Sequence, residues 1–453
     1  MLQNAYNLMN TIKEIVYKLS KDLTSTKIQV LSQICKSIFI ATGKITMLEI
    51  SRTTQRTYRT IQRFFALKNV AWSKFNMLLF KQYIEKEEDV LLLAADETVE
   101  KKAGKHTYGI ARFFSNIFKQ TVPSVAFIVL SIISFKSRKS YPIAVEQIIK
   151  KVKEQQENDS LPEKFKEKKE KKEKKSIGRP KGSKNNKKKE SKDVQYEVLR
   201  NLLTIVCPLL GTTTITYLLL DGYFANQYYI GLANQFKLNL ISKLRSTVSL
   251  YFPYTGEQKK RGKKRKYGEK IDVEHLSKNY LRKREVKEDC VLEYYQLLAW
   301  NKNITDFQLN VVIIRAISKK TKKVGYCYLF TGDLNLSYDK IVEYYSLRFQ
   351  IEFNFRDAKQ YFGLADFKNY KQAQVTNAAN ISFFMCNIAY ILAEEFKRYF
   401  KLQNASILDM KAYYRTELIA NETLKLKIER QNPLQFLNTD DIFELAKFQA
   451  VNF

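Results

Sequence analysis

The sequence predicts an α/β protein in which a mixed β-sheet follows a helical N-terminal region and precedes a helical tail. Residues 1–88 show helical periodicity and contain no proline. From residue 89 onward, short apolar runs of strand length alternate with helix-like stretches, which is typical of α/β folds. Hydrophobic residues make up 45% of the 453 residues, so the chain is able to bury a sizeable core.

The expected elements follow in chain order. Three successive buried strands are predicted at residues 90–95, 107–114 and 122–135. A strand at 214–220, a helix at 224–235 and a strand at 238–244 come next. Residues 246–333 are predicted to form a β-rich insertion, with strands at 291–300, 307–317 and 324–330. A single helix is expected from residue 337 to 362. The implied domains are 1–88, 89–245, 246–333, 334–400 and 401–453.

The charge of the chain points to a polyanionic partner. Lys and Arg number 78 against 46 Asp and Glu, which gives a formal net charge of +32. Two runs carry part of this excess: residues 163–192 hold 15 basic and 5 acidic side chains, and residues 259–270 hold eight against one. The rest of the chain is basic as well, so the folded surface must contribute. Nucleic acid is therefore the expected partner.

Cysteine and histidine usage limits the chemistry. The five cysteines are far apart, and the chain has only two histidines, so neither a zinc site nor a disulfide framework is expected. A catalytic metal would have to be held by carboxylates, which select Mg²⁺ or Mn²⁺. The longest apolar run, 122–135, is shorter than the ~20 residues that span a bilayer. We expect a reduced, cytoplasmic protein without a membrane partner.

A lysine-rich tract at residues 152–193 is too polar to pack into a core and is predicted to be a disordered insert. Its centre reads Gly178-Arg179-Pro180, similar to the Gly-Arg-Pro core of minor-groove-binding hooks, although Ile177 stands where those hooks carry an arginine. Arg179 is accordingly a candidate DNA contact. A solvated linker is the alternative interpretation.

Two aspartates occupy equivalent positions. Asp96 follows the apolar run 90–95, and Asp221 follows the run 215–220. Neighbouring parallel strands lie ~4.8 Å apart, so carboxylates at the ends of such strands would lie close enough to share divalent cations. The alternative is that either aspartate caps a helix or binds a ribose, as strand-end aspartates do in other α/β folds.

The helix predicted at 337–362 carries a polar stripe. At 100° per residue, Tyr345, Arg348, Glu352, Arg356 and Lys359 lie on one side, directly beside an apolar stripe. Glu352 is therefore expected at the rim of the core, facing a groove. The flanking arginines at i−4 and i+4 are equally typical of an ordinary surface salt-bridge ladder.

Together these residues resemble the DDE transposases of bacterial insertion sequences, in the branch with the Y-x2-R-x3-E-x6-K signature. Tyr345, Arg348, Glu352 and Lys359 match all four signature positions. The order strand-Asp, strand-Asp, β-rich insertion, helix-Glu agrees as well. The resemblance covers roughly residues 89–365 and implies an RNase H-like core.

The resemblance implies that Asp96, Asp221 and Glu352 hold two Mg²⁺ ions, with Mn²⁺ as a substitute, for cutting DNA and joining the freed 3′-OH to target DNA. It also implies that Tyr345 and Arg348 engage phosphate near the cleaved end and that Lys359 contacts transposon DNA. A homodimer in the active complex is implied because two DNA ends must meet. The alternatives are an RNase H-like nuclease without strand transfer and an inactive DNA-binding protein.

Further DNA contacts are expected outside the signature helix. The β-rich insertion in such enzymes can hold an aromatic residue that stacks on a flipped base, and Trp300 is the candidate here, with strand packing as the alternative. In the N-terminal region a basic helical face opposite an apolar one suits a helix lying on double-stranded DNA. A solvated arginine face is the alternative. The residues of this face are Arg52, Arg56, Arg59 and Arg63.

Overall fold

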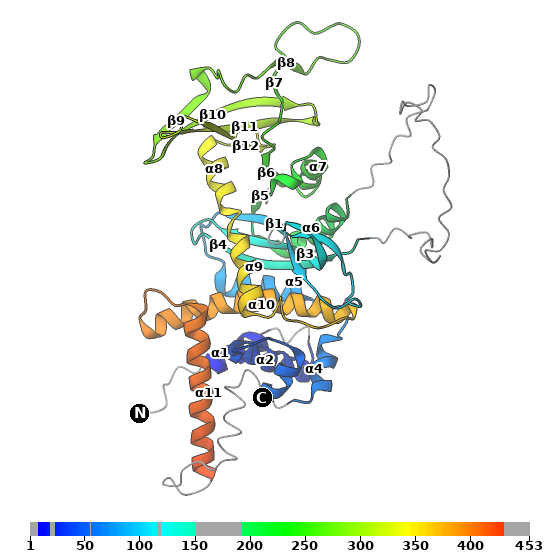
Figure 1. The fold of residues 1–453 in the computed structure, drawn as a ribbon, viewed down its shortest axis with the longest axis vertical. Coiled ribbons are helices and arrows are strands. Elements are labelled where there is room, and N and C mark those ends of the chain that lie inside the picture. Colours follow the sequence, from blue (N-terminus) through cyan, green and yellow to red (C-terminus); the bar gives the residue numbers. More distant parts are fainter. Residues whose placement is uncertain (1–7, 19–22, 55, 116–118, 151–192, 430–453) are drawn as a thin grey trace, which may run out of the picture.

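The structure is a computed structural model that describes residues 8–18, 23–54, 56–115, 119–150 and 193–429. Its ribbon is elongated (Figure 1). A β-rich region lies at one end, a mixed sheet with helices lies in the middle, and the N-terminal helices lie at the other end, beyond helix α10 (Gln372–Phe400). The lysine-rich tract, with Arg179, lies outside the described residues.

The central sheet is mixed, as expected. Its first strands are β1 (Leu91–Lys101), β2 (Ala111–Ser115), β3 (Gln120–Ser134) and β4 (Lys139–Ile148). Strands β5 (Ile215–Leu220) and β6 (Asn239–Leu244) follow along the chain. β1 pairs with β3 in antiparallel fashion and with β5 in parallel fashion, while β6 runs parallel to β5. β4 pairs with β3, so the order across this part is β4, β3, β1, β5, β6.

The sequence-based strand assignment needs two corrections. β2 buries only Phe113 rather than its whole length, because it pairs only with the first residues of β3. β4 was not predicted, although its first eight residues include six buried ones. It pairs with β3 through an irregular register near Ser131, where Pro142 faces that residue. A proline inside a strand is a signal against strand prediction, and β4 tolerates it at this irregularity.

The β-rich region continues the same sheet. It contains β7 (Leu250–Pro253), β8 (Tyr267–Lys270), β9 (Leu281–Val286), β10 (Cys290–Asn301), β11 (Ile304–Ser318) and β12 (Val324–Thr331). β12 pairs with β6, which joins the two parts into one sheet of twelve strands. The long β10–β11 hairpin projects from this junction toward the end of the molecule (Figure 1).

Different helices cover the two faces of the central sheet. Leu91, Leu93 and Ala95 pack in a core cluster with α6 (Val194–Leu210) and α7 (Gln227–Gln235). Leu92 and Ala94 point the other way and pack with α8 (Tyr338–Leu347). This alternation follows from the two-residue period of a strand. It places every even-numbered side chain of β1, including residue 96, on the α8 side.

A third cluster joins the N-terminal region to the sheet. It contains residues of α2 (Ser25–Ile40), α4 (Tyr58–Phe65), α5 (Trp72–Leu79) and α10, together with Val125 and Phe127 of β3. Helix α1 (Leu8–Tyr17) adds Ile12 and Ile15, and α11 (Ile407–Glu429) adds Met410 and Tyr414. The described part of the first 84 residues thus contains helices, with a π-helical turn η1 at Phe80–Ile84, and shares a core cluster with β3.

Two segments that the sequence predicts as single helices are each divided into two helices in the structure. The helix expected at 337–362 is divided into α8 and α9 (Gln350–Tyr361), which meet at Arg348 and Phe349. The sequence predicts one helix for the basic face at Arg52–Arg63. In the structure, α3 (Met47–Thr54) and α4 are separate helices. Between them, Thr57 has an extended backbone with ψ 144°, and its hydroxyl caps α4. Side-chain periodicity in the sequence extends across such joints, whereas the regular i→i+4 hydrogen bonds of an α-helix are interrupted there.

Candidate active site

Asp96 lies within β1, not at its end. β1 continues to Lys101, because its antiparallel partner β3 extends the pairing, with Asp96 opposite Val129. The expectation of a strand-end aspartate was therefore wrong for this residue. The parallel partner β5, however, ends beside it, since Ala95 pairs with Leu220. Asp96 shares the sheet face of Leu92 and Ala94, which is the face covered by α8.

Asp221 follows the last residue of β5 directly, as predicted. Leu219, two residues earlier, packs in the same cluster as Leu92 and Ala94, so the strand period directs Asp221 to the same face as Asp96. The next residue, Gly222, passes so close to β6 that a Cβ would lie 2.9 Å from the Lys243 carbonyl oxygen. Ser242 Oγ donates to the Asp221 carbonyl at 3.1 Å. These contacts fix the turn that carries Asp221.

Arg348 links Asp96 to Glu352. Its Nη1 lies 2.7 Å from Asp96 Oδ2, and its Nη2 lies 3.4 Å from Glu352 Oε1. The Arg348 and Asp96 side chains are only 14% and 18% exposed, whereas that of Glu352 is 43% exposed. A residue at the α8–α9 joint thus connects strand β1 to helix α9 at the edge of the core.

The electrostatics agree with a cluster of like charges. Burial, together with the nearby Asp221 and Glu352 carboxylates, raises the pKa of Asp96 to about 6, while Arg348 opposes the shift. Burial would lower the pKa of Arg348, but Asp96, Tyr345, Asp221 and Glu352 together raise it. Burial also raises the pKa of Tyr345 to about 12. Asp221 and Glu352 therefore both act on Asp96, and Arg348 is surrounded by acidic groups.

The other residues of the predicted stripe have different partners. Arg356 does not flank Glu352 as expected: its guanidinium pairs with Asp357 at 3.0 Å and lies over the Phe353 ring. Lys359 Nζ contacts Glu100 Oε1 at 2.7 Å and the Val99 carbonyl at 3.1 Å, so it holds α9 against β1.

Sequence reasoning missed two groups that hold α9 in place. Glu100, the partner of Lys359, lies four residues beyond Asp96 on the same face of β1, a spacing that the strand period could have indicated. Asn354 is fully buried; its Nδ2 donates to Ser140 Oγ at 2.8 Å, and its Oδ1 accepts from the Tyr390 hydroxyl at 3.3 Å. No sequence signal indicates these partners, which come from β4 and α10.

The carboxylates suit a hard divalent ion. Within the described residues, no three acidic, His or Cys side chains gather closely enough to form a metal cage, and Arg348 lies between two of the candidates. The donor set nevertheless fits: Asp96 is a largely buried carboxylate near two others, and burial raises its pKa. Oxygen ligands of this kind are those that Mg²⁺ and Mn²⁺ prefer.

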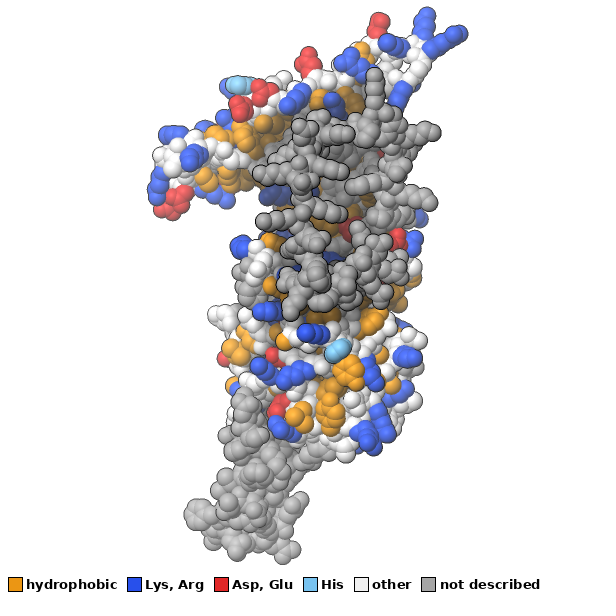
Figure 2. Space-filling model, turned by 45° about the vertical axis from the view of Figure 1, so that its right-hand side comes forward, with side chains coloured by type: hydrophobic (Ala, Val, Ile, Leu, Met, Phe, Trp, Pro, Cys, Tyr) orange, Lys and Arg blue, Asp and Glu red, His pale blue; other side chains and the backbone are white. Residues whose placement is uncertain are grey.

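Trp300 lies at the end of β10, away from the carboxylates. It pairs with Tyr251 of β7, and Lys266 Nζ lies 4.8 Å from its ring centroid. The loop between β7 and β8 exposes the basic side chains of the predicted run, and Lys and Arg gather at the corresponding tip in Figure 2. Arg265 of this loop lies over the ring of Tyr254, at 4.5 Å. Trp300 therefore adjoins a cationic, aromatic loop.

The N-terminal arginines are all exposed but come from three segments. Arg52 lies in the last turn of α3, and its guanidinium lies 3.7 Å from the Glu49 carboxylate. Arg56 lies between the helices and donates to Gln33 of α2 at 2.9 Å. Arg59 and Arg63 share α4, whose other face buries Ile61, Phe64 and Phe65. One basic helical face is thus limited to Arg59 and Arg63.

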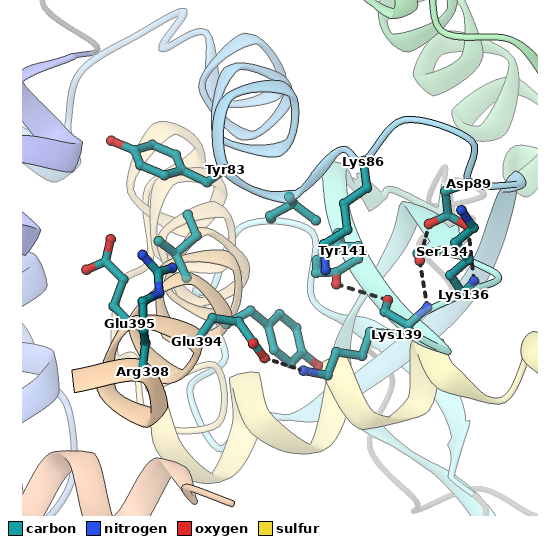
Figure 3. Close-up of a pocket in the computed structure, with 14 residues that line it drawn as sticks. Tyr83, Lys86, Asp89, Ser134, Lys136, Lys139, Tyr141, Glu394, Glu395 and Arg398 are labelled. Carbon is teal, nitrogen blue, oxygen red and sulfur yellow. Dashed lines mark hydrogen bonds and ion pairs between the residues drawn. The ribbon is translucent and has the colours of Figure 1, made fainter. Parts of the chain in front are cut away.

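A cavity of about 380 Å³ lies elsewhere, between η1, β3, β4 and α10 (Figure 3). Its lining combines basic and acidic side chains, several of which already pair with one another. Lys139 Nζ lies 3.2 Å from Glu394 Oε1, and Asp89 accepts from Ser134 and from the Lys136 backbone. None of the predicted site residues lines it, so we assign it no role in the chemistry.

Helix α10 is long and apolar enough to cross a membrane, but most of its length is buried inside the protein. The family model for DDE superfamily endonucleases matches residues 18–302. This range is more than half of the chain and includes Asp96 and Asp221 but ends before α8. No curated protein matches the sequence significantly.

Proposed function

Because the chain belongs to the DDE superfamily of endonucleases, we propose that it is a transposase that cleaves the ends of its own DNA element and joins the 3′-OH to target DNA. One observation carries this proposal. Asp96 and Asp221 lie on adjacent parallel strands and on one sheet face, and Arg348 connects Asp96 to Glu352. This placement on one side of the sheet supports a shared role for the three acidic residues.

Asp96, Asp221 and Glu352 would hold the Mg²⁺ ions, or Mn²⁺ in their place. When bound, such ions lower the pKa of the attacking hydroxyl and stabilise the leaving oxygen of an in-line displacement. The chain has only two histidines, and neither is among the residues gathered here. The burial of Asp96 keeps water away from one side of the site, while the exposure of Glu352 leaves the other side open to DNA.

We assign the protein to the branch with the Y-x2-R-x3-E-x6-K signature and to a bacterial insertion sequence. Tyr345, Arg348 and Lys359 would contact phosphates of the transposon end, with exposed Arg356 beside them. The support is positional: Arg348 lies among the carboxylates, the pKa of Tyr345 responds to Asp221, and Lys359 lies further along α9. For Lys359 to reach DNA, its contact with Glu100 must open.

Other parts of the surface would bind the remaining DNA. Trp300 and the β7–β8 loop supply an aromatic ring beside cations, which suits bases and phosphates. The N-terminal arginines Arg52, Arg56, Arg59 and Arg63 supply a second basic surface. We propose a homodimer in the active complex and association with the nucleoid in the cytoplasm.

The decisive experiment replaces each carboxylate separately. We expect Asp96→Ala, Asp221→Ala and Glu352→Ala to lower Mg²⁺-dependent nicking and joining of duplexes with the element's ends by about a thousandfold or more. DNA binding should persist, because it depends on separate basic surfaces. Glu343→Ala is the control, since Glu343 is an exposed carboxylate of α8 that pairs with Lys340.

The outcomes separate the alternatives. Nicking without joining by the unmodified protein would identify a nuclease that performs no strand transfer. Binding without either reaction would identify an inactive DNA-binding protein. If Glu352→Ala still cleaved at a normal rate, Glu352 would be removed from the site while the two aspartates remained.

A further inference from the structure

The guanidinium of Arg348 occupies the position between two proposed metal ligands. It approaches Asp96 at 2.7 Å and Glu352 at 3.4 Å, and its side chain is largely buried. The backbone of Arg348 is fixed as well, since its N–H donates to the Tyr345 carbonyl at 3.1 Å and its carbonyl accepts from Ile351 at 3.2 Å. The side chain is therefore the movable part of this contact.

Arg348 serves here as the cation of a carboxylate cluster. A largely buried carboxylate such as Asp96, with two other carboxylates nearby, needs a positive charge beside it, and Arg348 supplies that charge to both Asp96 and Glu352. A divalent ion bound by the same oxygens would supply more charge in the same place. The guanidinium and the ion should therefore compete for the two carboxylates.

A released Arg348 would have a second ligand available. The planar guanidinium binds carboxylates and phosphates with the same paired N–H geometry. Glu352, one of its two present partners, is the more exposed, so the guanidinium lies at the side from which DNA would approach. Binding to the carboxylates and binding to a phosphate draw on the same donors and exclude each other.

We propose that Arg348 is an exchange residue: it neutralises Asp96 and Glu352 before the divalent ion binds, and ion binding releases it to a DNA phosphate. Metal loading would thereby strengthen DNA binding through this one side chain. The inference rests on the proposed function, because it uses the proposed metal ligands and a DNA substrate. It adds an order of events that the carboxylates alone do not specify.

Metal affinity provides the first test. Mn²⁺ would be titrated into metal-free protein by calorimetry, without DNA. We expect Arg348→Ala to bind Mn²⁺ about fivefold more tightly or better, because the competing cation is absent. Arg348→Lys should lie between the two proteins, since one ammonium group lacks the paired donors. Arg356→Ala is the matched control, because Arg356 pairs with Asp357 instead, and its Mn²⁺ affinity should equal that of the unmodified chain.

DNA affinity provides the second test. Binding of a fluorescein-labelled blunt duplex would be measured with Ca²⁺ and with EDTA. The unmodified protein should gain about fivefold more affinity from Ca²⁺ than Arg348→Ala does. Arg356→Ala should keep the full gain, even if its affinity falls under both conditions.

The results distinguish this inference from the proposed function. If the unmodified chain binds Mn²⁺ and Asp221→Ala abolishes that binding, the metal site stands. Unchanged or weaker Mn²⁺ binding by both Arg348 variants would then overturn the exchange alone. If Mn²⁺ binding is absent from the unmodified chain, the proposed function itself fails. If Arg348→Ala does not fold, Arg348→Lys decides the question.

Discussion

The joints α3–α4 and α8–α9 both interrupt a segment whose sequence reads as one helix. At the α8–α9 joint, Arg348 and Phe349 keep right-handed helical backbone angles, with ψ of −36° and −20°. At the α3–α4 joint, Thr57 is extended, with ψ 144°. The chain direction is therefore largely kept at one joint and changed at the other.

The backbone geometry of each joint determines whether the side chains of a predicted helical stripe stay together in the structure. Tyr345, Arg348 and Glu352 stay together across their joint, because the backbone there shifts only to short i→i+3 bonds such as Glu352 N–H to the Phe349 carbonyl at 3.0 Å. The four arginines around Thr57 divide among separate segments. A helical stripe is thus reliable only as long as every residue in it remains helical.

Buried asparagines hold α4 and α9 against other elements of the fold. We expect the largest stability effect at the end of α4. Asn377 of α10 accepts from Trp72 Nε1 at 2.8 Å and donates to the carbonyls of Phe65 and Leu67 just at and beyond the end of α4, both at 2.8 Å. Asn377→Ala removes this partner from two buried groups and from the partly buried Leu67 carbonyl, so we expect a loss of about 3 kcal/mol in urea unfolding. Asn380→Ala is the control, because the Asn380 amide bonds only to the Thr376 carbonyl of its own helix. Equal losses in both variants would contradict this role.

The α9 side should be somewhat less sensitive. Asn354→Ala removes one hydrogen bond from Ser140 and a longer one from Tyr390, and we expect a loss of about 2 kcal/mol, measured in the same way. A cost larger than that of Asn377→Ala would reverse the comparison between the two regions.

Lys411 of α11 joins the two regions and introduces a pH dependence. Its Nζ donates to the carbonyl of Ile38 in α2 at 2.6 Å and to that of Tyr361 in α9 at 3.3 Å. Burial, aided by Arg415, lowers its pKa to about 7. Between this value and the ordinary lysine pKa, the unfolded chain binds more protons than the folded one, so stability rises with pH.

The unmodified protein should therefore gain about 2 kcal/mol over Lys411→Met as the pH increases from 7 to 9, with a limiting slope of about 1.4 kcal/mol per pH unit. Urea unfolding of both proteins at several pH values measures this difference, and the contribution common to both cancels. A difference that stays constant with pH would show that Lys411 titrates like an exposed lysine.

The smallest effect is expected from the exposed arginines. Replacing Arg59 and Arg63 together by alanine should reduce the slope of log affinity for duplex DNA against log salt by about 2, because two phosphate contacts are lost. Arg52→Ala, which removes an arginine near Glu49, should change the slope less. Melting temperatures should be nearly constant. An unchanged slope in the double variant would identify a solvated face.

Local sequence patterns were sufficient for the parts of the site within one element. The apolar runs before Asp96 and Asp221 predicted two neighbouring strands, because buried parallel strands are continuous apolar segments. The spacing from Tyr345 to Lys359 identified the helical segment that brings Glu352 to the core. These features depend only on the strand and helix periods.

Tertiary structure decided what each side chain contacts. Asp96 lies inside its strand because β3 extends the pairing, Arg356 turns to Asp357, and Lys359 reaches Glu100 on β1. The sequence by itself determined the mixed α/β class, the basic charge and the three carboxylates, since composition and periodicity are properties of the chain. The placement of Arg348 between Asp96 and Glu352 required the sheet and α9 to pack together, because contacts between residues 252 positions apart leave no pattern in a single sequence.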